Sequence, residues 1–150
     1  MIQPINSVIN KFSQKTEFTF EICDSIHLLT ISKGKSLKIK VAVSPEYPEW
    51  EVFVFNRNND KILVSELFDY IPVTNLNQDE VKVELQKAAN DLNSFLERVS
   101  TTDVRVQERN TFFVKHLVFE SLDNGEWIFE FNNALVKWNN PDRGQKIIYT

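Results

Sequence analysis

The cysteine and the two histidines of this sequence, Cys23, His27 and His116, could serve as a nucleophile or a general base. Cys23 and His27 stand on either side of Asp24-Ser25, which indicates a turn, and a thiol beside an imidazole can form an activated nucleophile. Catalytic groups usually converge from distant segments, however, and alternation places Cys23 on the polar side of its strand. We therefore interpret this segment as a turn that carries an incidental thiol.

His116 lies within a predicted strand at 111–120 that is rich in apolar residues. Imidazole titrates near neutral pH, so His116 could act as a general base. Because a general base needs a positioned partner, we interpret it instead as a histidine on a sheet face. A small enzyme with dispersed catalytic residues, drawn from His116, Cys23 and His27, is kept as an alternative function.

The remaining motif tests exclude several kinds of site. Glycine occurs only at positions 34, 125 and 144, so neither of the common phosphate-binding loop patterns is present. One cysteine rules out a disulfide within the chain and a zinc site made of several cysteines, and His-Glu-x-x-His is absent. We expect no catalytic residue, no metal site and no cofactor, and therefore no enzyme.

The best candidate for partner binding is the segment 45–50, where two prolines stiffen a loop between strands. It carries the carboxylates Glu46 and Glu49 and the rings Tyr47 and Trp50. Tyrosine and tryptophan are enriched where proteins bind proteins, and a stiff loop loses less entropy on binding. The alternative is that Trp50 and Tyr47 tuck under the sheet and leave the glutamates solvated.

Lys33, Lys35, Lys38 and Lys40 form the most basic part of the sequence. They could contact phosphate, and a ligand-binding or nucleic-acid-binding sheet is the third function considered; it would need exposed rings near Lys38 and Lys40. We favour a structural interpretation, in which the lysines of a solvated hairpin discourage edge-to-edge pairing.

The first half of the chain predicts a short helix and a meander. Pro4 and the spacing of apolar residues in 4–13 indicate the helix. Phe18, Phe20 and Ile22 then alternate with polar residues and are expected to face inward. Further strands are predicted at 26–32, 37–43, 50–55 and 61–65, while 66–71 is ambiguous between a short helix and an irregular link.

The central amphipathic helix is predicted at 77–99. Asn77 and Glu80 have the spacing of a capping box, and Leu76 and Val81 that of a hydrophobic staple. One apolar stripe runs along the helix, which is typical of a helix that packs on a sheet. Its members are Val81, Leu85, Ala88, Leu92, Leu96 and Val99.

The last third predicts strands again. Segments 103–108 and 111–120 flank a predicted turn at Arg109-Asn110, and 123–125 has the sequence of a hairpin turn. Trp127, Phe129 and Phe131 then alternate with other residues, as on one face of a strand. Shorter strands are predicted at 134–138 and 145–149, with a turn at 141–144.

Composition sets the class. The chain has 150 residues, 42% of them hydrophobic and 25% charged, which is typical of one globular domain. We expect a single α+β domain over 1–150, with antiparallel β-meanders packed against the two helices. No signal peptide or membrane span is visible, so cytoplasmic residence is expected by default.

The formal net charge of −4 makes nucleic acid an improbable partner and mildly favours a basic one. The leading hypothesis is therefore a non-catalytic protein-binding domain. Examples of that class are an immunity protein that neutralises a toxin and a chaperone for a secreted effector.

Overall fold

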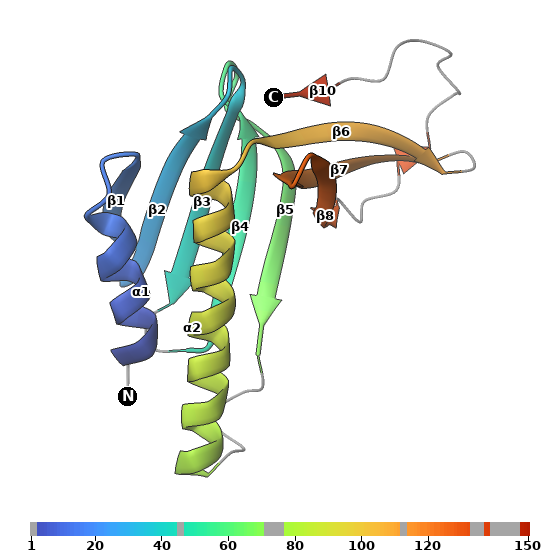
Figure 1. Ribbon diagram of the computed structural model, residues 1–150. Helices are drawn as coiled ribbons and strands as arrows, with labels where there is room; N and C mark the ends of the chain where they lie inside the picture. Colours follow the sequence, from blue (N-terminus) through green and yellow to red (C-terminus); the bar gives the residue numbers. More distant parts are fainter. Residues whose placement is uncertain (1–2, 45–46, 71–76, 112–113, 133–136, 139–147) are drawn as a thin grey trace. The chain divides into compact units, whose positions relative to one another are not determined.

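The computed structural model describes residues 3–44, 47–70, 77–111, 114–132, 137–138 and 148–150. Over these residues the chain forms an α+β fold with two helices and two antiparallel sheets, as the sequence predicts (Figure 1). The helices are α1 (Gln3–Ser13) and α2 (Gln78–Thr101).

The first sheet is a meander, because its five strands lie in chain order. They are β1 (Phe18–Cys23), β2 (Ile26–Lys33), β3 (Leu37–Ser44), β4 (Glu49–Asn56) and β5 (Lys61–Asp69). The predicted strands are confirmed, and β5 resolves the ambiguous segment 66–71 in favour of strand as far as Asp69.

The second sheet has the strand order β10-β6-β7-β8, with β9 also paired to β7. Its strands are β6 (Val104–Thr111), β7 (Val114–Asp123), β8 (Glu126–Asn132), β9 (Lys137–Trp138) and β10 (Ile148–Tyr149). The predicted turn at 141–144 and parts of the strands predicted at 134–138 and 145–149 fall outside the described residues.

The chain divides into two compact units. The first comprises 1–31, 40–52 and 67–101, and the second comprises 32–39, 53–66 and 102–150. Each unit has its own buried apolar residues. Ile5, Phe12, Leu29, Leu92 and Leu96 belong to the first, and Leu37, Val54, Val106, Phe119 and Phe131 belong to the second. The single domain expected from the sequence stays a prediction.

In the first unit α1 and α2 lie side by side (Figure 1). Lys11 of α1 joins them, since its Nζ lies 2.7 Å from Glu97 Oε1 and 2.9 Å from Asn93 Oδ1 of α2. The hydrogen bond from Lys11 is the main reason why the pKa of Glu97 lies below its usual range. The ammonium group of Lys11 and the carboxylate of Glu97 are both exposed to solvent, so this ion pair adds little to stability.

The capping box of α2 is confirmed. Oδ1 of Asn77 accepts hydrogen bonds from the backbone N–H groups of Asp79 and Glu80 at 3.0 and 2.9 Å. Glu80 Oε2 in turn accepts from the N–H of Asn77 at 2.9 Å. The staple with Leu76 falls outside the described residues. Most of the predicted stripe is buried, as are Ala89 and Phe95, whereas Val81 is only partly buried.

In the second unit, β7 and β8 form a hairpin at Asn124-Gly125. Both residues have positive φ, at 49° and 81°, as a two-residue type I′ turn requires. The turn predicted at Arg109-Asn110 is wrong. These residues lie in β6, where they pair with His116 and Lys115 of β7.

Two expectations about strand faces need correction. Phe18, Phe20 and Ile22 do share a face, but only Phe18 is buried, while Phe20 is 39% and Ile22 61% exposed. β1 is an edge strand, and its first residue packs against α1, where the Phe18 ring lies 5.5 Å from that of Phe12, whereas its later residues are exposed.

The aromatic rings of β8 also differ from the expected arrangement. The register between β7 and β8 shifts at Phe119/Glu120, so Phe131 lies opposite Phe119 while Phe129 lies opposite Glu120. Phe119 and Glu120 are consecutive and face opposite ways, so Phe129 and Phe131 do too. The expectation that Trp127, Phe129 and Phe131 share one face is therefore wrong, because this β-bulge changes the alternation.

Neither helix in the part of the chain that the structure describes has the length and apolar character needed to cross a membrane.

Candidate binding surface

The structure does not assemble Cys23 and His27 into a catalytic pair. In the β1–β2 hairpin Cys23 lies opposite Ile26 and Ile22 lies opposite His27. Adjacent positions point to opposite faces, so the thiol and the imidazole project to different sides of the sheet. Cys23 is exposed, and the His27 ring packs edge-on against Phe20 with their centroids 5.5 Å apart.

His116 lies opposite Arg109 in the second sheet, and its Nδ1 is buried with no hydrogen-bond partner among the residues that the structure describes. No hydrogen bond between His116 and a carboxylate, which would orient the imidazole as a base, occurs among the described residues. Within the described residues there is also no group of three or more His, Cys, Asp or Glu side chains placed to hold a metal ion.

The predicted binding loop is only partly at the surface. Tyr47 is 53% exposed and Glu49 is partly exposed, whereas Trp50 is 3% exposed. Glu46 lies outside the described residues. For Trp50 the geometry corresponds to the alternative interpretation, in which the ring tucks under the sheet. A role of Tyr47 and Glu49 in binding stays a prediction.

Trp50 belongs to an aromatic cluster that fixes α2 on the first sheet. Its ring stacks on Phe68 of β5 at 4.0 Å between centroids and contacts Phe95 of α2 at 5.5 Å. Its Nε1–H donates to the Tyr70 hydroxyl at 3.3 Å, and that hydroxyl donates to Asp91 Oδ2 at 2.8 Å. Both the ring and the N–H group of Trp50 therefore have partners inside the first unit.

Burial, followed by the hydrogen bond to Asp91, raises the pKa of Tyr70 well above its usual range. A tyrosine with so high a pKa keeps its proton at neutral pH and donates to the carboxylate. We interpret Tyr70 as a structural bridge between β5 and α2 rather than as an acid or a base.

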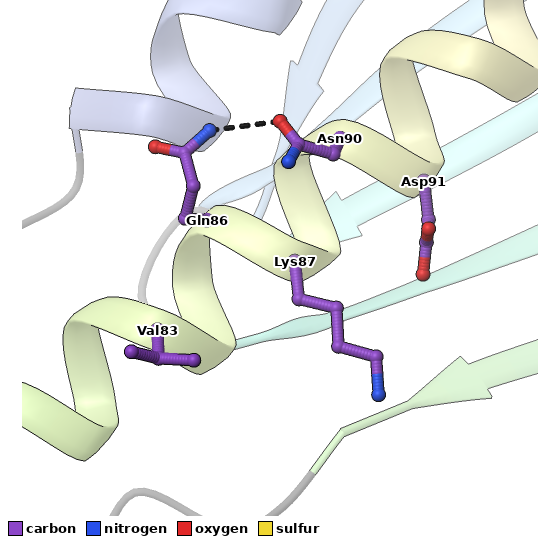
Figure 2. A pocket seen from close by; sticks show the side chains of 5 residues that line it. All are labelled: Val83, Gln86, Lys87, Asn90 and Asp91. Carbon is purple, nitrogen blue, oxygen red and sulfur yellow. Dashed lines mark hydrogen bonds between the residues drawn. The ribbon is translucent and has the colours of Figure 1, made fainter.

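Beside this bridge, α2 carries an open depression of about 380 Å³, lined by Val83, Gln86, Lys87, Asn90 and Asp91 (Figure 2). Gln86 and Asn90 lie one turn apart and share a hydrogen bond of 2.8 Å. The five residues come from one helix, and the polar side chains lie along its surface. Among the described residues the lining comes from α2 alone, which surrounds a ligand on too few sides to hold it.

One face of the second sheet carries a cluster of charged and aromatic side chains. Directly opposite residues in an antiparallel sheet project to the same side. Arg105 lies opposite Glu120, Glu120 lies opposite Phe129, and Leu122 lies opposite Trp127. With Arg109, four residues along β6 from Arg105, these form what we call the arginine–aromatic face, defined by Arg105, Arg109, Glu120, Trp127 and Phe129.

Glu120 is the centre of this face. Its side chain is only 1% exposed, and it accepts a hydrogen bond on each oxygen. Arg105 Nε donates to Oε1 at 3.1 Å, and Arg109 donates from a terminal nitrogen to Oε2 at 2.9 Å. A carboxylate this deeply buried is tolerated because two cations compensate its lost hydration.

The aromatic residues complete the face. The Arg105 guanidinium lies 4.1 Å from the centroid of the Trp127 ring, so Arg105 is held between that ring and Glu120. Phe129 is 57% exposed, and the Arg109 side chain is 51% exposed. Glu120, Arg105 and Trp127 therefore hold one another in place, and the exposed Phe129 ring and Arg109 side chain lie on the same face.

The opposite face of the same sheet is core. Val104, Val106, Phe119, Ser121 and Phe131 are all buried. The Ser121 hydroxyl donates to Glu130 Oε1 at 2.8 Å, so this polar group also has a partner. The second sheet thus has one largely buried face, on which Ile128 remains exposed, and one face with a polar–aromatic surface.

The arginine–aromatic face is absent from the sequence predictions. Arg105 and Gln107 alternate with Val104 and Val106, and Arg109 follows at the same period of two, a pattern that would have shown two cations on one face of a strand. Placing a turn at Arg109-Asn110 removed Arg109 from that strand. The pairing of Glu120 with both arginines depends on register, which the sequence does not display.

The predicted lysine cluster is only partly available for binding. Lys38 Nζ lies 2.7 Å from Asp60 Oδ1 and 5.1 Å from the centroid of the Phe55 ring, both in the second unit. Phe53 and Phe55 are half-buried and contact each other at 6.3 Å. Lys38 therefore holds β3 to the turn between β4 and β5. The edge-protecting role expected for these lysines is wrong, because β2 and β3 are inner strands of the five-stranded sheet.

Comparison with known proteins identifies no relative: no family model, curated protein or solved structure matches this chain.

Proposed function

We propose that this protein is a non-catalytic protein-binding domain whose contact surface is the arginine–aromatic face. One observation carries the proposal. Arg105 is fixed between buried Glu120 and the Trp127 ring, and Phe129 and Arg109 stand exposed beside it. An immunity protein or other inhibitor, or a chaperone for a secreted effector, fits this class.

The residue types favour a protein partner. Tryptophan and arginine are the side chains most enriched among binding hot spots, and hot spots work best when their geometry is set before binding. The hydrogen bonds to Glu120 set the geometry of both arginines in advance. Phe129 supplies exposed apolar area next to them, as an interface core needs.

The charge of Arg109 indicates which chemical group the partner presents to this face. Arg109 uses one terminal nitrogen for Glu120 and has further N–H donors on a half-exposed side chain. A carboxylate on the partner, next to an apolar group that covers Phe129, matches this surface. The net charge of −4 on the whole chain still favours the approach of a partner that is basic overall.

The test is capture of a partner from the native cell with variants of β8 and β6. Phe129→Ala and Arg109→Ala should each weaken the complex by at least about tenfold, as expected for hot-spot truncation. Ile128→Ala is the matched control, since Ile128 is the neighbouring residue, is 43% exposed and faces the other side of the sheet. Equal binding by all three variants would remove this face from the interface.

The predicted loop is tested in the same assay. Tyr47→Ala and Glu49→Ala weaken binding only if the loop at 45–50 also contacts the partner. Loss of binding in these two variants, with full binding by Phe129→Ala, would transfer the interface from the second sheet to that loop.

Neither alternative function has comparable support. An enzyme built on Cys23 and His27 would need both groups on one side of the sheet, and they project to opposite sides. A nucleic-acid platform would need open rings beside free lysines, whereas Lys38 is paired with Asp60 and packs on Phe55. Binding of RNA or single-stranded DNA at low salt would reopen that alternative.

A further inference from the structure

The outer edge of β1 has the properties of a strand-pairing site. β1 is the first strand in the order of its sheet, so it has only β2 as a neighbour among the described strands. Its pairing with β2 is continuous from Phe18 to Cys23, without a bulge. All of its residues after Phe18 are exposed, including the large apolar side chains Phe20 and Ile22.

Proteins normally protect such edges with lysine, proline, a bulge or several charges. β1 contains none of these except one charge, Glu21. By contrast, the edge strand β8 has glutamates at 126 and 130 and a shift of register, and β5 carries Lys61, Glu66 and Asp69. β1 is therefore the least protected of these three edges.

We propose that β1 pairs with β1 of a second copy of this chain, antiparallel and about a two-fold axis at Phe20. In this register Phe20 lies opposite Phe20 of the second copy, and Ile22 lies opposite Phe18. Thr19 then lies opposite Glu21. Apolar residues meet on one face and polar residues on the other, which is the pattern that stabilises cross-strand pairs.

Repulsion between glutamates favours a two-fold axis at Phe20 over an axis at Glu21. An axis at Glu21 would also keep the apolar faces together, but it would place two glutamates directly opposite each other, which is destabilising. An axis at Thr19 would leave Ile22 without an apolar residue of β1 opposite it. The sequence of β1 is thus self-complementary about Phe20, and this favours a second copy over an unrelated strand.

This inference is independent of the proposed function. β1 belongs to the first unit, whereas the arginine–aromatic face belongs to the second. A monomeric protein could still bind its partner through that face, and a dimer could fail to bind it.

Disulfide trapping tests the register in the full chain with Cys23 replaced by serine. Phe20→Cys places the two new cysteines directly opposite each other, with Cα atoms about 4.5–5.5 Å apart, which allows a disulfide. Ile22→Cys is the matched control, because its two copies would be four residues apart along the strands, about 13 Å. That separation is too long for a disulfide.

We expect oxidised glutathione to convert the Phe20→Cys protein to a covalent dimer and to leave the Ile22→Cys protein monomeric. Equal cross-linking of both variants would indicate random collision and overturn the register. Cross-linking of neither variant would overturn the proposal.

A second measurement does not depend on cysteine. Sedimentation velocity over a concentration series should show the wild-type chain approaching twice its 17.6 kDa mass. Ile22→Lys should keep it monomeric, since a lysine protects the edge. Val83→Lys, at a residue of α2 that is 64% exposed, should leave the dimer intact. A monomeric wild-type protein at all concentrations would contradict the inference.

Discussion

Arg105 and Glu120 lie directly opposite each other in β6 and β7, and the Arg105 Nε–H donates to the buried carboxylate at 3.1 Å. The remaining carboxylate oxygen accepts from Arg109. One side chain without access to water thus orients two cations that reach the surface. Stability and the geometry of the candidate binding surface depend on the same three residues.

Replacing Glu120 by glutamine should destabilise the fold. The amide can satisfy fewer of the arginine donors, and the charge compensation is lost. We expect the free energy of unfolding to fall by about 2 kcal/mol, below the value for a fully buried pair because both arginines can turn toward water. Urea unfolding of Glu120→Gln against the wild type measures this.

Glu126→Gln is the control, because Glu126 is exposed at the start of β8. It should change the free energy of unfolding by less than about 0.5 kcal/mol. If the two variants unfold at the same urea concentration, the buried carboxylate does not hold this face together.

Removing the N-cap of α2 should cost about 1 kcal/mol. Asn77→Ala removes the acceptor for the N–H groups of Asp79 and Glu80. Asn77→Asp keeps an acceptor at the same place and should unfold near the wild-type midpoint. Thermal or urea unfolding distinguishes them, and equal midpoints for alanine and aspartate would show that the cap contributes nothing.

The sequence predicts elements well where local chemistry determines them. The capping box at Asn77 and Glu80 and the turn at Asn124-Gly125 are present as expected, because both depend on residues within four positions of each other. The apolar spacing of α1 and α2 likewise indicates the face that is buried.

Register and exposure are less visible in the sequence. The β7–β8 bulge sends Phe131 to the core and leaves Phe129 on the other face, although both fit the same alternation. Phe20 and Ile22 have the pattern of core residues, but their burial depends on how far α1 covers the edge strand. Neither fact follows from short-range periodicity.

The candidate site was missed for the same reason. Glu120 becomes the centre of a cluster because β6 and β7 place Arg105 and Arg109 within reach of it, across fifteen and eleven positions of sequence. The loop chosen from the sequence had the right residue types, but Trp50 is used inside the first unit, against Phe68.

Stability should fall at alkaline pH because of Tyr70. Its pKa is raised in the folded state, so the folded protein keeps this proton after the unfolded chain has lost it. The contribution is complete below the unfolded pKa of about 10 and is lost as the pH rises above it. Urea unfolding between pH 8 and about pH 11 should show this decline in the wild type.

Tyr70→Phe should be less stable near neutral pH, because the bridge from Trp50 to Asp91 is lost, and its stability should decline less steeply at alkaline pH. Tyr47→Phe is the control at an exposed tyrosine and should keep the wild-type slope. Identical slopes for Tyr70→Phe and the wild type would show that Tyr70 titrates normally.

Two glycines with positive φ should differ sharply in their tolerance of a methyl group. Gly34 has a φ of 56°, and a Cβ there would lie 2.5 Å from the carbonyl carbon of Thr150, whose oxygen accepts from the N–H groups of Lys35 and Ser36. Gly125 has a φ of 81° and open space around it.

Gly125→Ala should therefore cost about 1 kcal/mol of backbone strain alone. Gly34→Ala should cost about 2–4 kcal/mol, because the methyl group also displaces the main chain at Thr150. Urea unfolding gives the difference, and hydrogen exchange at Lys35 and Ser36 reports the lost contact. Equal costs for the two substitutions, with unchanged exchange at both amides, would show that Thr150 is not held against this hairpin.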